Sequence, residues 1–238
     1  EAFHGASSGL GYSAAYHSIF QTILKENPAA AGTLTPKIIM VADCFAIDPL
    51  LFAALIQQES RFDASVDGVN GIGLGQMTQD GMDEIHHQMR LCKAGEKNCE
   101  AGEGSETFYS NTIQNCVAPS FEYQFPEAVP AIRQVGTRIM VRSEMSNPNV
   151  NLVYAAILLK LHLARNGSGK KLVETYRQAL IDYNGNKRRV IIRNKRGRVI
   201  SRREVRKIYA ERVLGYAAQL KVLALQMVSK SKRKTIKL

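Results

Sequence analysis

The sequence contains no tryptophan, no CxxC pair and no apolar run of the roughly eighteen residues that a membrane-spanning helix needs. The missing run excludes a membrane span, and the missing CxxC pair argues against zinc ribbons and fingers. The histidines do not change this, because three are scattered and the side chains of the adjacent His86 and His87 diverge on a helix. We therefore predict no metal site and no cofactor.

The sequence also lacks an initiator methionine and an apolar signal core, since it begins at Glu1. We interpret it as the mature or trimmed form of an exported protein, periplasmic or secreted, whose signal peptide has been removed. The length of 238 residues favours one domain with elaborations, and we expect a monomer. Hydrophobic residues make up 45% of the chain, which is enough to build a core.

Acidic residues are in the minority, and the net charge is +11. Between residues 187 and 207, 11 of 21 residues are Lys or Arg, and Glu204 is the only acid. A basic tail follows at 229–238. This distribution suits a polyanion, such as nucleic acid, an anionic lipid surface, or a cell wall rich in carboxylate and phosphate. The alternative is a solvated face and a frayed tail.

The four cysteines are Cys44, Cys92, Cys99 and Cys116. Cys92 and Cys99 bracket a polar stretch and have the pattern of a small loop closed by a disulfide. An even count in a basic chain fits two disulfides and an oxidising compartment. Four buried free thiols in a cytosolic protein are the alternative.

Proline and the apolar pattern mark the first elements. We expect residues 1–30 to be an N-terminal lead, poorly ordered up to about residue 15. Thr35-Pro36 and Asp48-Pro49 are two helix starts, each with a capping residue followed by proline. The second helix is apolar almost all round from Leu50 to Gln58, which predicts that it is buried.

Further patterns predict a mainly α protein with a little β. Basic residues around a glycine at 190–200 predict a short β-hairpin. The segment 91–147 carries three cysteines and is predicted to be an insertion. The further helices are expected near residues 79–90, 128–140, 151–164, 172–181 and 202–228.

Glu59 stands out because the buried helix delivers its carboxyl next to a glycine-rich loop, Gly68–Gly73. Partial burial raises the pKa of a carboxyl, and the negative end of a helix dipole acts in the same direction. A carboxyl that is neutral near pH 7 can act as a general acid and then as a general base. By position alone, Glu59 is equally a helix-end residue that reaches solvent.

Three motifs in register change this balance. They are Ile47–Phe62, which contains Gln58-Glu59-Ser60, then Gly71–Met77, and then Ala179–Gly185, which contains Tyr183-Asn184-Gly185. Together they resemble the lytic transglycosylase and goose-type lysozyme family. Two weaker matches are Asn151-Leu152 at a helix start and Tyr209–Tyr216 in a closing helix.

The resemblance implies a role for each matching residue. Glu59 matches the family's catalytic acid, which protonates the oxygen between N-acetylmuramic acid and N-acetylglucosamine in peptidoglycan. Ser60 and Gln76 match residues that touch the glycan. Tyr183 and Asn184 match the pair that faces the acid. The implied fold is lysozyme-like, with a catalytic domain at 31–228.

The chain departs from the family pattern at Gly75, where the family usually has Met, and in the insertion. Both are natural places for a change of substrate. A closer resemblance is to lysozymes of predatory bacteria that prefer de-N-acetylated glycan.

The choice of reaction depends on a second carboxylate. An inverting hydrolase uses one to activate water, whereas a transglycosylase lets the muramic C6 hydroxyl attack and forms a 1,6-anhydro end. Asp67 matches a water-positioning Asp of goose-type enzymes, and we treat it as the candidate base. A second goose-type Asp is replaced by Thr78. Asp67 is equally an Asx-turn residue that holds the loop, so both reactions stay open.

Two non-enzymatic classes compete with this prediction. A helical nucleic-acid-binding protein is favoured by the basic stretch at 187–207, but no helix-turn-helix pattern occurs and tryptophan is absent. We therefore expect no nucleic acid as partner, and a contact of the basic stretch with an anionic wall or envelope surface instead. The second class is a catalytically inactive wall-binding module.

Overall fold

The structure is a computed structural model that describes residues 11–68, 71–89, 108–167, 169–184, 192–193 and 199–235. Over these residues the chain is mainly helical, as predicted, and the strands are limited to one short antiparallel pair. In the same part of the chain, no helix combines the length and the apolar character that crossing a bilayer requires.

The elements follow one another in this order. The first are α1 (Tyr12–Glu26), the 3-10 turn η1 (Pro28–Ala30), α2 (Ala31–Cys44), α3 (Pro49–Ser60) and α4 (Gln79–Gln88). Next come α5 (Phe108–Thr112), the π-helix η2 (Ile113–Val117), α6 (Ala118–Glu122), η3 (Pro126–Ala128), α7 (Val129–Gln134) and η4 (Arg142–Ser146). The last are α8 (Pro148–Asn166), α9 (Leu172–Tyr183), β1 (Ile192–Arg193), β2 (Val199–Ile200) and α10 (Arg202–Thr235).

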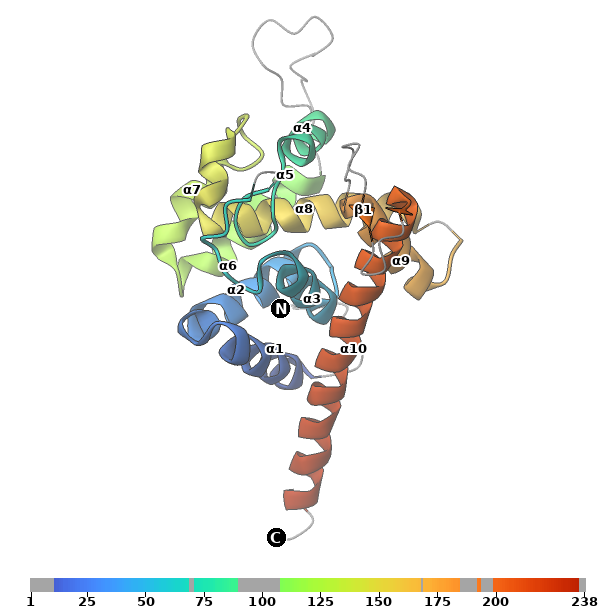
Figure 1. Cartoon of the computed structure of the whole chain (residues 1–238). Helices are drawn as coiled ribbons and strands as arrows, with labels where there is room; N and C mark the ends of the chain where they lie inside the picture. The colour runs from blue at the N-terminus through green and yellow to red at the C-terminus, as the bar shows by residue number, and fades with distance from the viewer. Residues whose placement is uncertain are drawn as a thin grey trace, which may run out of the picture.

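Helix α3 lies at the centre of the molecule, with α10, α2 and α1 packed against it (Figure 1). It begins as predicted, because the Asp48 carboxylate accepts hydrogen bonds from the backbone of Leu50 at 2.8 Å and Leu51 at 3.4 Å. Every residue from Pro49 to Ile56 is buried, which confirms that the helix is covered on all sides. A helix enclosed in this way can hold its last residues in a fixed position.

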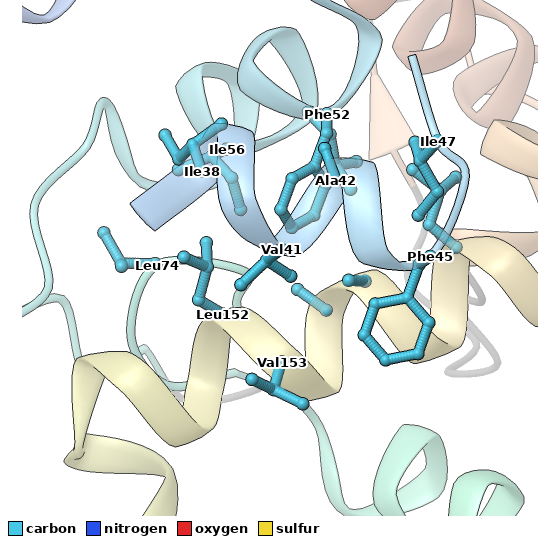
Figure 2. Packing of buried hydrophobic residues seen from close by; sticks show 14 of the residues in the cluster. Ile38, Val41, Ala42, Phe45, Ile47, Phe52, Ile56, Leu74, Leu152 and Val153 are labelled. Atoms are coloured by element: carbon cyan, nitrogen blue, oxygen red, sulfur yellow. The ribbon is translucent and has the colours of Figure 1, made fainter. Parts of the chain in front are cut away.

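Helix α8 forms the opposite wall of the core and is buried over most of its length. Figure 2 shows Val41 of α2 and Phe45, the residue that follows α2, directed toward Leu152 and Val153 of α8. All four side chains are fully buried. The core therefore joins α2 to α8, and the same hydrophobic cluster includes the buried residues of α3.

The prediction of an N-terminal lead at 1–30 is wrong from Tyr12 onward, because α1 is part of the core. Ile19 and Ile23 are fully buried. The hydroxyl of Ser18, also buried, donates a hydrogen bond of 2.6 Å to the carbonyl of Leu220 in α10. Small residues on this face let the two helices approach closely. Residues 1–10 lie outside the described part of the chain.

The start of α2 differs from the prediction at Thr35-Pro36. The helix begins at Ala31, directly after η1, and Pro36 lies inside it. The Thr35 hydroxyl does not cap the helix but donates at 2.8 Å to the carbonyl of Ala31, one turn earlier. Pro28, which opens η1, takes the place that the sequence assigned to Pro36.

The described part of the predicted insertion, residues 108–147, packs into the same core. Ile113, Phe121 and Ile132 are fully buried. A disulfide joins Cys116 in η2 to Cys44 at the end of α2, which confirms one of the two predicted disulfides. The predicted loop between Cys92 and Cys99 lies outside the described residues.

Two predicted helices have different ends. The helix predicted at 128–140 stops at Gln134, because Gly136 adopts a left-handed backbone with φ of 83°. The helix predicted at 202–228 continues as α10 to Thr235, so residues 229–235 extend it and are not a separate tail.

The strands β1 and β2 pair antiparallel, with Ile192 opposite Ile200 and Arg193 opposite Val199. The turn of the predicted hairpin lies outside the described residues, as do residues 187–191 and 194–198 of the basic stretch. Its predicted contact with an anionic surface stays a prediction.

Candidate active site

Glu59 occupies the penultimate position of α3, next to the long helix α10. Its carboxylate accepts a hydrogen bond from the hydroxyl of Tyr209, which is 150 positions later in the chain and lies in α10. Glu59 is only partly exposed and Tyr209 is buried. The Glu59 carboxyl of α3 is therefore directed toward α10, while part of the side chain stays accessible to solvent.

The surroundings of Glu59 make its carboxyl a weak acid. Burial raises the pKa of Glu59 to about 7, and the hydrogen bond from Tyr209 opposes part of this rise because it stabilises the ionised form. The direction agrees with the rise predicted from the sequence. At neutral pH the carboxyl is divided between its two protonation states, so it can both donate and accept a proton.

Tyr183 is the last residue of α9 and is a second phenol near Glu59. Its hydroxyl donates a hydrogen bond of 2.9 Å to the carbonyl of Gly75, in the loop after α3. Burial and the negative charge of Glu59 raise the pKa of Tyr183 well above its ordinary value. Burial and the negative charge of Glu59 also raise the pKa of Tyr209 well above its ordinary value. Two protonated phenols thus accompany the carboxyl, and the predicted role of Tyr183 toward a glycan stays a prediction.

Gly75 is required by close packing. A Cβ atom at this position would lie 2.5 Å from the Cβ of Ala155 and 3.0 Å from the hydroxyl of Tyr183. The Gly75 N–H donates at 2.8 Å to the side chain of Asn151, which is fully buried in α8. Where the family pattern has a methionine, this loop instead lies directly against α8 and Tyr183.

Asn151 connects this loop to the turn before α8. Its side-chain amide donates to the carbonyls of Ile72 at 2.7 Å and Met145 at 2.9 Å. With the bond from Gly75, these contacts satisfy two donors and one acceptor of a buried side chain. The match at Asn151 therefore marks the residue that holds the loop in place.

Gln76 directs its polar side chain into its own loop. The side-chain amide donates to the carbonyls of Gly73 at 2.9 Å and Val66 at 3.3 Å, and the backbone has a positive φ of 47°. The two donors of this amide are thus used to keep the loop closed. Direct contact of Gln76 with a ligand stays a prediction.

Ser60 and Asn184 have mainly local contacts. The buried hydroxyl of Ser60 donates at 3.2 Å to the carbonyl of Ile56, within the same helix. The backbone N–H of Asn184 donates at 3.2 Å to Leu180 and closes the end of α9. Both residues flank members of the site, and their contact with a glycan stays a prediction.

Asp67 pairs with Arg142 and not with Glu59. Its carboxylate lies 3.5 Å from the guanidinium of Arg142 and is 71% exposed. Burial and Tyr209 are the influences that shift the pKa of Glu59, and within the described residues no second carboxylate is among them. The candidate base therefore has no contact that links it to Glu59, and its predicted role stays a prediction.

A polar depression between α4, α8, α9 and α10 lies beside the site. Two of its charges, Glu84 and Arg165, form an ion pair, and Asp182 accepts a hydrogen bond of 2.9 Å from Asn166. In the part of the chain that the structure describes, no three His, Cys, Asp or Glu side chains are arranged to hold a metal ion. The residues that line the depression are Asp80, Asp83, Glu84, His87, Gln88, His162, Arg165, Asp182 and Arg206.

Tyr209 has no role predicted from the sequence. The segment Tyr209–Tyr216 is a match to a closing helix, but no local pattern shows that its first residue reaches a carboxyl in α3. Comparison with known proteins adds no further assignment, since no family model, no curated protein and no solved structure matches this chain. The functional argument therefore depends on the residues and their geometry.

Proposed function

We propose that this protein cleaves the glycan strands of bacterial peptidoglycan between N-acetylmuramic acid and N-acetylglucosamine, with Glu59 as the proton donor. The observation that carries the proposal is the carboxyl of Glu59, whose pKa of about 7 results from burial and which accepts a hydrogen bond from Tyr209. The three motifs in register support the substrate class and a lysozyme-like fold. Export to the cell envelope is part of the same proposal.

The proposed reaction begins with Glu59 in its protonated form. Proton transfer to the glycosidic oxygen breaks the bond to C1, and positive charge develops on the muramic ring. Glu59 is then ionised and can take a proton from the incoming nucleophile. The hydroxyl of Tyr209 stabilises the ionised carboxylate during this interval. One carboxyl thus serves both steps.

Two nucleophiles can complete the reaction, and the contacts of Glu59 favour the one that needs no second carboxylate. Asp67 is exposed and paired with Arg142, and it does not shift the pKa of Glu59. In the route without a second carboxylate, the C6 hydroxyl of the muramic residue attacks C1, gives its proton to Glu59 and leaves a 1,6-anhydro end. Attack by water would leave a reducing end.

Mass spectrometry of the products from purified sacculi tests the proposal. We expect soluble muropeptides with 1,6-anhydro ends, and the same spectrum reports the N-acetylation of each sugar. Reducing ends would overturn the proposed route and assign a hydrolase with a base still to be identified. Tight retention of duplex DNA without any release of muropeptides would overturn the proposed function.

The variant Tyr209→Phe is expected to move the alkaline limb of the pH profile to higher pH, by about one unit. The hydrogen bond from Tyr209 lowers the pKa of Glu59, so its loss raises that pKa. Activity requires protonated Glu59 and falls as the pH rises through this pKa. The measurement is the initial rate at which a suspension of sacculi loses turbidity, from about pH 5 to about pH 9.

Tyr216→Phe is the matched control, because Tyr216 lies two turns further along α10 and is partly buried. Its profile should coincide with that of the unmodified protein. A limb that moves to lower pH in Tyr209→Phe, or does not move, would contradict the role assigned to this hydrogen bond.

A further inference from the structure

The distal part of α10 extends past the helices against which the rest of α10 packs (Figure 1). Leu220 and Ala224 are buried, and Val228 is partly buried against the core. The helix continues for seven more residues to Thr235. We call residues 221–235 the distal segment.

Large apolar side chains are exposed on this segment. Val222 is 53% exposed, Leu225 49% and Leu223 39%. Val222 and Leu225 are three positions apart and therefore lie on one face of the helix, away from the buried Ala224. Three such side chains within four residues form a small apolar surface where the helix leaves the body.

The charge around this surface has one sign. From residue 212 to residue 238 the sequence has seven Lys or Arg residues and no Asp or Glu. Lys221 precedes the apolar surface and is exposed. The other cations that follow the apolar surface are Lys230, Lys232, Arg233, Lys234 and Lys237.

We propose that the distal segment of α10 binds the surface of a bilayer that contains anionic phospholipid. A helix that combines exposed apolar side chains with several cations gains energy from both the acyl boundary and the lipid phosphates. A second copy of this chain fits less well, because pairing two distal segments brings like charges together. Nucleic acid would use the cations but leave Val222 and Leu225 exposed to water.

The orientation follows from the same helix. Tyr209, which donates to Glu59, and Leu225 are sixteen residues apart in α10, or about 24 Å along its axis. This axial distance sets an approximate upper limit on how far Tyr209 lies from a bilayer bound at Leu225. The surface binding itself does not depend on the proposed glycan cleavage.

Vesicle co-sedimentation with the full chain tests the inference. The vesicles contain phosphatidylcholine alone or mixed with an equal part of phosphatidylglycerol. We expect binding to the mixed vesicles only, and affinity lower by about tenfold or more for Val222→Ser/Leu225→Ser. The matched control is Leu172→Ser/Val173→Ser, at two exposed apolar residues of α9, which should bind like the unmodified chain.

Three results would overturn the inference. One is the absence of binding to the anionic vesicles. The second is binding to duplex DNA at least as tight as binding to vesicles, with both unaffected by Val222→Ser/Leu225→Ser. The third is a dimer in sedimentation velocity without lipid that the same variant dissociates, which would assign the surface to a second copy. Glu59→Gln should bind vesicles like the unmodified protein. A failure of the proposed glycan cleavage can therefore be distinguished from a failure of the proposed membrane binding.

Discussion

Glu59→Gln is expected to lower the release of soluble muropeptides from sacculi by about a thousandfold. Glutamine has the size of glutamate but carries no acidic proton, so the glycosidic oxygen leaves without protonation. The Tyr209 hydroxyl can still donate to the amide oxygen of Gln, which keeps the geometry of the site. The loss should therefore appear in the rate of cleavage, and pull-down on sacculi should be unchanged.

The control for this variant is Glu122→Gln, which makes the same chemical change at an exposed glutamate of α6. Its rate should equal that of the unmodified protein. Unchanged clearing of sacculi by Glu59→Gln would remove this residue from the mechanism, and loss of both clearing and pull-down would point to a damaged fold.

The stability of Glu59→Gln provides a second readout. An unfolded glutamate ionises near pH 4.5, whereas burial keeps Glu59 protonated up to about pH 7. Its folded-state pKa is raised, so the folded form binds the proton more tightly and loses stability as the pH rises from 4.5 to 7. Gln removes this cost of up to about 3 kcal/mol, and the variant should be more stable than the unmodified protein at pH 8 but not at pH 4.

Local signals predicted the part of the site that one segment of chain builds. Asp48-Pro49 predicts where α3 begins, and the apolar run after it predicts that the helix is buried. Glu59 is then the penultimate residue of this helix. The rise in the pKa of Glu59 depends on burial, which an all-round apolar helix predicts. These properties need only the sequence between residues 48 and 60.

The partners of Glu59 depend on contacts between distant segments, which no periodic pattern encodes. Tyr209 reaches Glu59 only because α10 packs along α3. The sequence shows Gly75 only as a departure from the family pattern, and the structure adds that it lies in close contact with Ala155. The contact of Gln76 with a glycan stays a prediction, and the structure adds that its amide holds its own loop.

The N-terminal error has the same origin. Gly, Ala and Ser residues before Tyr16 have the composition of a flexible lead, yet the small residues of α1 are what lets it approach α10. The hydrogen bond from Ser18 to Leu220 spans 202 positions. Composition describes a segment in isolation, whereas α1 is stabilised by a helix at the other end of the chain.

Removing the disulfide with Cys44→Ser/Cys116→Ser is expected to lower the free energy of unfolding by about 4 kcal/mol. The two cysteines are 72 positions apart, so the bond closes a long loop and restricts the unfolded chain strongly. Urea unfolding followed by circular dichroism measures the loss. The matched control is Cys92→Ser/Cys99→Ser, since a bond between these cysteines would close a much shorter loop and its removal should cost less.

The position of this bond makes its loss informative about the site. The loop between Cys44 and Cys116 contains α3, Glu59, the Gly75 turn and α4, while Tyr183 and Tyr209 lie outside it. The disulfide thus favours the fold in which the carboxyl meets its two phenols, but it contacts none of them. We therefore expect unchanged cleavage by the serine variant at low temperature and a loss of activity on heating that follows its unfolding curve. A slower rate at temperatures where the variant is fully folded would show instead that the bond sets the geometry of Glu59.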